Sequence, residues 1–232
     1  MRLVLISDTH GLHPTQELPE GDVLVHAGDF CNGGSFQDCV EYCIWLKNHI
    51  DKYKVVVQIA GNHDFCTQNK PEEVKKEFKN WFSDKLVYLC DEAFEFSGLK
   101  FYGSPWQPWF LDWAWNLPRG EKLAEVWSKI PADTDVLITH GPPYGILDKV
   151  RRGSENVGCK DLLAKIKSMQ NNLLLHVFGH IHETHGIYEN KDFVTKFVNA
   201  SICTDDYRPI NKPIVVDVHD YDYKGKVAYV VY

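Results

Sequence analysis

The stretch that decides the fold is Met1-Arg-Leu-Val-Leu-Ile-Ser-Asp8-Thr-His10. Its apolar run, residues 3–6, is short and rich in aliphatic side chains, and polar residues follow it at once. A run of this kind predicts a strand that is buried on both faces. It is too short, with too few basic residues ahead of it, for a secretory signal peptide. At its end, Asp8 and His10 lie two residues apart, so both side chains could reach one metal ion.

Four further runs have the same form. They are residues 23–25, 55–59, 136–138 and 174–178, and each is followed by a Gly, Asp or His cluster. Segments with helical character lie between them, at residues 35–50, 70–82, 121–129 and 160–169. Ser35 is a suitable N-cap for the first, and Pro71 is tolerated in the first turn of the second. Strands that alternate with helices predict an α/β layered fold whose helices cover a largely buried sheet.

The C-terminal part of the chain breaks this alternation. Residues 213–218 and 227–232 are β-branched and aromatic, and they flank residues 222–226 with Gly225 among them. This pattern predicts a closing antiparallel hairpin with Gly225 in its turn, and hence mixed sheets. The chain has no repeat, low-complexity tract or linker-like run, so we expect residues 1–232 to form a single domain.

Composition narrows the classes of function. The content of 44% hydrophobic and 25% charged residues is ordinary for a soluble protein. No stretch approaches the roughly 20 apolar residues that cross a bilayer, so no membrane partner is expected. A formal net charge of −7 argues against long nucleic acids as partners, because these require clustered Lys and Arg. Bound divalent cations would still attract a small anionic substrate to a carboxylate-lined site.

The cysteines indicate the redox compartment. There are seven at irregular spacing, which fits neither a disulfide framework nor a paired Cys-x-x-Cys zinc site. This usage predicts a reducing compartment, namely the cytoplasm. Cys39 and Cys43 share a helix face, where free thiols are expected to pack in the core.

Polar clusters follow all five predicted strands directly. In layered α/β folds the carboxyl ends of neighbouring strands meet in one crevice, so these clusters are expected to form a single site. The clusters are Asp8-Thr-His10, Gly28-Asp29, Gly61-Asn-His-Asp64, His140-Gly141 and Gly179-His-Ile-His182.

Each cluster also has a structural interpretation. Asp-x-His or Gly-Asp alone is commonly an ordinary loop, and His140 alone could be a hydrogen-bonded core histidine. Gly-His-x-His alone fits a turn as well as it fits a metal site. All five at strand ends are better explained by metal binding. Carboxylate, imidazole and amide ligands without thiolate suit two divalent ions such as manganese, iron or zinc, and paired ions that share a carboxylate are common in phosphoryl transfer.

The combined pattern resembles the calcineurin-like metallophosphoesterase superfamily, and the resemblance runs from Asp8 to His182. Four further runs are similar to the metallophosphoesterase-domain-containing branch of that superfamily. They are Tyr102-Gly-Ser-Pro-Trp-Gln-Pro-Trp109, Asn116-Leu-Pro-Arg-Gly120, Thr139-His-Gly-Pro-Pro143 and Asn199-Ala-Ser-Ile-Cys203. The resemblance implies a metallophosphatase fold, which is a layered α-β-β-α sandwich of mixed sheets.

The resemblance also implies a role for each residue of the site. It implies two divalent metal ions, with Mn²⁺ expected first and iron, zinc or Mg²⁺ as alternatives. The first metal would be held by Asp8, His10 and His182, and the second by Asn62, His140 and His180. Asp29 would bridge the two ions. His63 would be catalytic, either stabilising charge on the phosphoryl oxygens or protonating the leaving alkoxide. Asp64 would orient His63 or cap the turn, and we prefer the second interpretation.

The activity implied by this resemblance is hydrolysis of small phosphodiesters, with cyclic nucleotides as the leading candidates, by in-line attack of a metal-bridging hydroxide. A phosphomonoesterase or protein phosphatase is the first alternative. A weakly active nucleotide-binding scaffold is the second, and the intact set of seven ligands argues against it. The expected partner is therefore a small phosphodiester or nucleotide.

Several nearby residues carry weaker predictions. The backbone N–H groups of Asn32 and Gly33 could bind a phosphate, although a plain helix-entry loop explains the same residues. Residues 106–115 are dense in aromatic side chains, which could stack on a nucleobase or cover the crevice, and we favour packing. His13 and His185 could touch the substrate, but solvated loop positions are favoured. Any of four arginines could bind phosphate, and the sequence does not select among Arg119, Arg151, Arg152 and Arg208.

Overall fold

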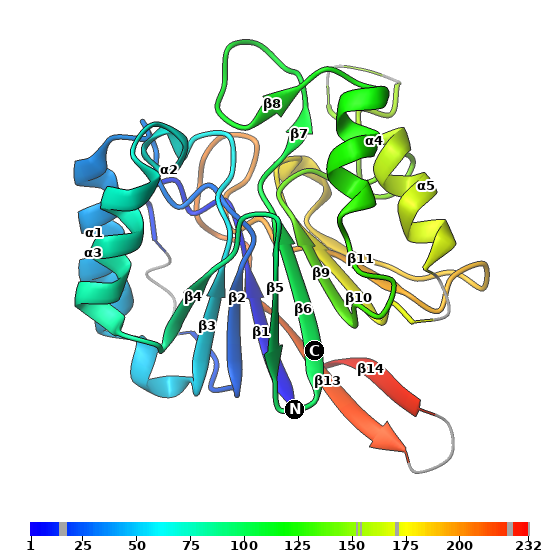
Figure 1. Cartoon of the computed structure of the whole chain (residues 1–232), viewed down its shortest axis with the longest axis horizontal. Helices are drawn as coiled ribbons and strands as arrows, with labels where there is room; N and C mark the ends of the chain where they lie inside the picture. Colours follow the sequence, from blue (N-terminus) through cyan, green and yellow to red (C-terminus); the bar gives the residue numbers. More distant parts are fainter. Residues whose placement is uncertain (14–17, 152, 154, 170–171, 222–224, 232) are drawn as a thin grey trace.

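The computed structural model describes residues 1–13, 18–151, 153, 155–169, 172–221 and 225–231. Two six-stranded mixed sheets lie between two layers of helices (Figure 1). The α-β-β-α sandwich expected from the sequence is therefore confirmed.

The first sheet has the order β14-β13-β1-β2-β3-β4. Its parallel strands are β1 (Arg2–Ile6), β2 (Val23–His26), β3 (Val55–Gln58) and β4 (Leu86–Tyr88). The C-terminal hairpin of β13 (Ile214–Tyr221) and β14 (Gly225–Val231) adds to this sheet antiparallel to β1, as predicted. Gly225 is not in the turn but is the first residue of β14, paired with Tyr221, and its φ of +75° is one that glycine adopts easily. The predicted turn residues 222–224 lie outside the described residues.

The second sheet has the order β11-β12-β10-β9-β6-β5. Its parallel centre consists of β6 (Leu99–Ser104), β9 (Val136–Thr139), β10 (Leu175–Phe178) and β12 (Lys196–Asn199). The antiparallel edges are β5 (Glu92–Phe96) and β11 (Gly186–Tyr188). The sequence predicted β9 and β10 but missed the other four strands. A separate short ribbon pairs β7 (Gln107–Pro108) with β8 (Asn116–Leu117).

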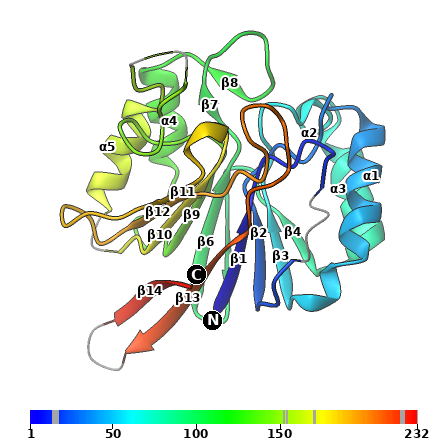
Figure 2. The same ribbon diagram turned by 180° about the vertical axis from the view of Figure 1, so that it is seen from behind.

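Helices cover the outer face of each sheet (Figures 1 and 2). On the first sheet these are α1 (Phe36–Lys47) and α3 (Pro71–Phe82), with the short α2 (Phe65–Asn69) ahead of α3. On the second they are α4 (Glu121–Ser128) and α5 (Lys160–Ser168). Ser35 caps α1 through a capping box with Asp38, as its sequence position predicts. The predicted helix 35–50 is shorter than expected, because α1 ends at Lys47 and a 3-10 turn, η1 (Ile50–Lys52), follows.

Strand alternation explains why the predicted strands are apolar on both faces. Leu3 and Leu5 of β1 pack into the core between the two sheets, whereas Val4 and Ile6 pack under α1 and α3. The core between the sheets draws on both ends of the chain, from Leu3 to Ala228. We propose on this basis that residues 1–232 form one domain. Within the described residues, no helix is both long and apolar enough to cross a membrane.

All seven cysteines are free thiols, and only Cys90 is partly exposed. Cys39 and Cys43 are buried on the inner face of α1, so the prediction that they pack in the core is confirmed.

Candidate metal centre

The polar clusters meet where the two sheets come together at the carboxyl ends of their strands. Asp8 and His10 follow β1, Asp29 follows β2, and Asn62 and His63 follow β3. His140 follows β9, and His180 and His182 follow β10, with His182 opening the 3-10 turn η2 (His182–Thr184). The loops are joined by backbone hydrogen bonds, from Asp8 N to Gly28 O and from Gly179 N to His140 O, each 2.9 Å long. All eight side chains that the sequence predicted are thus brought into one region.

The backbone of this region is strained. Four of the predicted ligands have left-handed backbone conformations, with φ of +52° at Asp8, +46° at His10, +56° at Asp29 and +68° at His180. L-residues rarely adopt such angles, and the cost is of order 1–3 kcal/mol each when the surrounding structure enforces them. Strain concentrated at these residues is typical of a functional site.

Two glycines allow the loops to approach closely. A Cβ at Gly61 would collide with the Asp29 carboxylate and with the His140 ring. A Cβ at Gly179 would collide with the carboxylate of Asp8 and the hydroxyl of Ser7. The sequence runs Gly-Asn-His-Asp and Gly-His-x-His therefore need their glycines for space beside the carboxylates.

Asp8, His10 and His182 form the first group. The Nε2 atoms of the two histidines lie 3.1 Å apart, and His182 Nε2 lies 3.3 Å from Asp8 Oδ1. Nδ1 of His182 lies 3.0 Å from the carbonyl of Thr204, which can only accept a hydrogen bond. His182 therefore carries its proton on Nδ1 when neutral and turns the Nε2 lone pair toward Asp8.

The second group is centred on the amide oxygen of Asn62. Oδ1 lies 2.9 Å from Nε2 of His140 and 2.8 Å from Nδ1 of His180. His140 donates from Nδ1 to the carbonyl of Ala27 at 3.0 Å, so a neutral ring faces the amide oxygen with a lone pair. Two acceptors at this distance require a cation or an additional proton between them.

Asp29 lies between the two groups. Its Oδ2 is 3.2 Å from Nε2 of His140 and 3.8 Å from Nε2 of His10. Its Oδ1 accepts the backbone N–H of His63 at 2.7 Å, which fixes the orientation of the carboxylate. One carboxylate oxygen is thus shared by both groups.

The electrostatics of the cluster favour positive charge. Burial opposes a charge on His140, but the Asp29 carboxylate outweighs burial and raises the pKa of His140 to about 9. Burial also opposes a charge on Asp8, yet a hydrogen bond donated by the protonated His182 ring holds the pKa of Asp8 well below its usual range. Burial lowers the pKa of His10 to about 4, so that ring is neutral and offers one nitrogen lone pair. Carboxylates that hold a positive charge among neutral imidazoles are the environment that divalent cations require.

His63 stands beside these groups. Its Nδ1 lies 2.7 Å from the carbonyl of Asn32, which leaves Nε2 as the ring nitrogen available to a substrate. Asp64 does not contact this ring. Its carboxylate accepts the backbone N–H groups of Asp29, Cys31 and Gly61 at 2.7 to 2.8 Å, so it ties loops together, in keeping with the turn-capping interpretation.

A pocket of about 320 Å³ opens onto the cluster. Six of the predicted residues line it, namely His10, Asp29, Asn62, His63, His180 and His182. The sequence did not single out most of the other lining residues, which are Phe110, Leu111, Trp113, Glu183, Asp205 and Tyr207.

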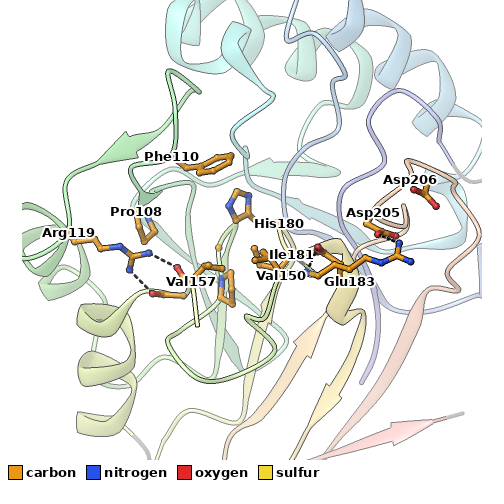
Figure 3. A pocket seen from close by; sticks show the side chains of 14 residues that line it. Pro108, Phe110, Arg119, Val150, Val157, His180, Ile181, Glu183, Asp205 and Asp206 are labelled. Atoms are coloured by element: carbon orange, nitrogen blue, oxygen red, sulfur yellow. Dashed lines mark hydrogen bonds and ion pairs between the residues drawn. The ribbon is translucent and has the colours of Figure 1, made fainter. Parts of the chain in front are cut away.

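A larger pocket of about 750 Å³ adjoins the first and shares Phe110, His180, Glu183 and Asp205 with it (Figure 3). The walls between these residues are largely apolar, formed by side chains such as Val150, Val157 and Ile181. The two pockets together form one groove that starts at the candidate metal ligands.

The arginines of this groove are already engaged. Arg119 donates to the carbonyls of Val157 and Gly158 at 2.5 and 2.6 Å, and Arg151 pairs with Asp205 at 2.8 Å (Figure 3). Arg208 is exposed and 3.8 Å from Asp206, and it lines neither pocket. Arg152 lies outside the described residues.

The structure does not bring Asn32 and Gly33 to the pocket. The backbone N–H of Gly33 donates to Asp38 at 2.9 Å, and the carbonyl of Asn32 accepts a hydrogen bond from Nδ1 of His63. His13 stacks on Trp45 instead of lining the groove, and His185 does not line it either. The segment 29–35 is therefore a helix-entry loop in this structure.

The aromatic stretch divides between packing and the groove. Trp115 is buried and Trp106 packs against it, as predicted. The preference for packing is wrong for Phe110, which is 56% exposed and lines both pockets. Trp113 packs on His63 and Phe65 and also lines the smaller pocket. Tyr207 packs edge-on against His10, with ring centroids 4.9 Å apart, and only its position next to Asp205-Asp206 could have drawn attention to it.

Comparisons with known proteins identify the family to which this chain belongs. The family model described as calcineurin-like phosphoesterase matches residues 1–184. The chain is 42% identical over 235 residues to Metallophosphoesterase domain-containing protein 1 of both Homo sapiens and Mus musculus, across 94% of this chain and 71% of each relative. Protein TT1561 of Thermus thermophilus shares the fold alone, with a TM-score of 0.56 and 13% identity over 85% of this chain and 88% of its own. The chain therefore belongs to the calcineurin-like phosphoesterase family, as its strand-end clusters predict.

Proposed function

We propose that this protein is a phosphodiesterase that hydrolyses small phosphodiesters, with cyclic nucleotides as the first candidates, and that it uses two divalent metal ions. Family membership supports the broader activity, a metal-dependent phosphoester hydrolase. The observation that carries the proposal is the shared position of Asp29 Oδ2, within 3.8 Å of ligand nitrogens in both groups.

The proposed ligands follow from the two groups. Asp8, His10 and His182 would hold one ion, Asn62, His140 and His180 the other, and Asp29 both. Nitrogen and oxygen donors without sulfur suit divalent ions such as manganese, iron or zinc. Mn²⁺ is our first candidate, with iron, zinc or Mg²⁺ as alternatives. When bound, two such ions lower the pKa of water and neutralise charge on a phosphoryl group.

Side chains of the site would then contact the substrate, orient the bridging carboxylate and exclude water. His63, fixed through Nδ1 by Asn32, would present Nε2 to the phosphoryl oxygens or to the leaving oxygen. Asp29 would retain its orientation through the bond from the His63 backbone. The apolar walls of the larger pocket would exclude water from the ester group.

The charges of the groove support a diester over a monoester. Glu183, Asp205 and Asp206 line the larger pocket together with two arginines, of which Arg151 is paired with Asp205 and Arg119 donates to backbone carbonyls. A phosphomonoester carries about −1.5 to −2 charge at pH 7, and a diester carries one negative charge. The less charged diester suits acidic walls better, and its second ester group would occupy the larger pocket.

A hydrolysis panel tests this proposal. The purified chain, stripped of metal and supplied with Mn²⁺, should turn over bis(p-nitrophenyl) phosphate and cyclic nucleotides faster than p-nitrophenyl phosphate or a phosphopeptide. Parallel samples with Zn²⁺ and Mg²⁺, with metal analysis of each, would identify the preferred ion. Faster turnover of the monoester would contradict the diesterase assignment and favour the alternative, a phosphomonoesterase or protein phosphatase.

The free state of all seven cysteines supports a reducing compartment, and we propose the cytoplasm. A fractionation experiment with the tagged chain tests this location, and recovery in an oxidising compartment would contradict it.

A further inference from the structure

The His63 imidazole is fixed at one ring nitrogen but needs a second restraint to fix its plane. The bond between Nδ1 and the Asn32 carbonyl, 2.7 Å long, leaves the ring free to tilt about that contact. His10 touches it only edge-on, with centroids 4.5 Å apart and planes at 80°. A catalytic side chain must be held close to its productive geometry, because a displacement of about 1 Å can cost roughly 100-fold in rate.

The indole of Trp113 supplies the missing restraint. It lies face to face with His63, with centroids 4.1 Å apart and planes at 26°. Trp113 also contacts Phe65, with centroids 5.9 Å apart, so its ring is itself supported. Among the residues that the structure describes, this is the closest contact of the His63 ring with another aromatic ring.

The segment around Trp113 is anchored to the same loop that carries His63. Ala114 N donates to Asn62 O at 3.1 Å. Trp115 N donates to Gln68 Oε1 at 2.9 Å, and Trp115 Nε1 donates to Thr67 Oγ1 at 2.8 Å. These three bonds reach residues 62–68, so the backbone that carries Trp113 cannot move far from the His63 loop without breaking them.

Burial alone does not account for this arrangement. Trp109, four residues earlier, is 60% exposed, so the same loop leaves one tryptophan in water. Trp113 instead lines the pocket at the candidate ligands, where its indole face stacks on the ring of His63.

We propose that Trp113 is a positioning residue for His63: its indole face fixes the plane of the imidazole and so directs Nε2 into the pocket. This inference rests on the proposed function for its kinetic part, because it assumes that His63 acts on the substrate. The stack itself can be measured without turnover.

Nuclear magnetic resonance tests the stack directly. With histidine ring carbons labelled in metal-free protein, the His63 Cε1–H resonance, assigned with His63→Gln, should lie upfield because the indole face shields it. It should move downfield in Trp113→Ala and remain largely upfield in Trp113→Phe. The same resonance position in wild type and Trp113→Ala would overturn the inference.

Kinetics tests the consequence. With Mn²⁺ and bis(p-nitrophenyl) phosphate, Trp113→Ala should lower kcat about 10- to 100-fold while KM and metal content stay close to wild type. Trp113→Phe, which keeps an aromatic face and the fold, should recover most of kcat, and the matched control Trp109→Ala should behave as wild type. A raised KM with unchanged kcat would make Trp113 a substrate contact and overturn the inference. An inactive wild type would contradict the proposed function instead, and the resonance would then decide whether Trp113 positions the ring.

Discussion

Each sheet buries one histidine inside a strand and others at the ends of its strands, and the two kinds have different partners. His26 in β2 lies 3.2 Å from the hydroxyl of Thr9, and His176 in β10 lies 2.8 Å from that of Thr139. His140 and His182 instead lie 3.2 and 3.3 Å from carboxylates. Burial lowers the pKa of each interior histidine to about 3, whereas the pKa of His140 is raised.

The difference shows what each kind of histidine does. Thr9 lies between two candidate ligands, and Thr139 directly precedes His140, so each interior histidine contacts the neighbouring strand next to the ligands at its end. The interior rings are neutral, and each contacts a threonine hydroxyl through Nε2. The rings at the strand ends face carboxylates and an amide oxygen in an arrangement that a cation completes. Substitutions at the two kinds should therefore separate metal binding from stability.

The largest effect is expected at Asp29. Asp29→Asn should lower turnover at least about 1,000-fold, because the shared carboxylate supports both proposed ions and several kcal/mol of transition-state stabilisation depend on them. Metal analysis should show fewer than two ions per chain. Asp148→Asn is a control matched in burial, at 2% exposed like Asp29, and its carboxylate accepts only from backbone groups outside the cluster. It should bind metal as wild type does, and equal metal loss in both variants would contradict a bridging role.

A smaller effect is expected at His180. Both His180→Ala and His180→Gly should lower affinity for one ion and reduce turnover about 100-fold. Without metal, His180→Gly should be more stable than His180→Ala by about 1 kcal/mol, because only glycine relieves the φ of +68°. Thermal unfolding in EDTA measures this difference. Equal stabilities would mean that the backbone at position 180 relaxes once the imidazole is gone.

The sequence could predict the ligand cluster because its residues depend on local pattern. Asp8, Asp29 and His140 each follow an apolar run, and parallel strands place their carboxyl ends together whatever the loops do. The same reasoning predicted β1, β2 and β3 of the first sheet and β9 and β10 of the second. It missed β5 and β6, whose residues 92–104 carry charged and glycine positions among the apolar ones.

Trp113 and Tyr207 could not be predicted in the same way. Both lie in loops without periodic pattern, whose paths are fixed by contacts far along the chain, such as that from Trp115 to Gln68. The sequence showed many aromatic residues near position 110, and tryptophan usually packs in a core. Which of them lines the groove depends on these long-range bonds.

A substitution at Thr139 should lower the unfolding free energy and have only a minor effect on metal affinity. Thr139 Oγ1 donates to Gly141 O at 2.8 Å and so accepts from Nε2 of His176. Thr139→Val keeps the shape but leaves both of these buried groups without this partner, which should cost about 1–3 kcal/mol of unfolding free energy. Mn²⁺ affinity should fall by less than about tenfold, since the ligand His140 is adjacent but unchanged. Thr195→Val is the matched control, because Thr195 is equally buried and donates to Leu173 O far from the cluster. Reduced Mn²⁺ affinity in both variants would show that the loss comes from general destabilisation.

The smallest effect is a change in how stability depends on pH. Burial lowers the pKa of His176 to about 3 from 6.5, so between these values the unfolded chain binds a proton that the folded chain does not. The contribution of His176 to the unfolding free energy therefore rises with pH across this window. It is fully present above about pH 6.5 and is lost as the pH falls toward about 3.

His176→Gln removes this titration while its amide can still donate to Thr139. In metal-free protein the slope of unfolding free energy against pH should fall by up to about 1.4 kcal/mol per pH unit within the window. Above the window the difference between wild type and variant should be constant, which serves as the internal control. An unchanged slope would mean that His176 gains a proton without unfolding. The distinction between neutral interior histidines and the charge-facing ones at the strand ends would then fail at this residue.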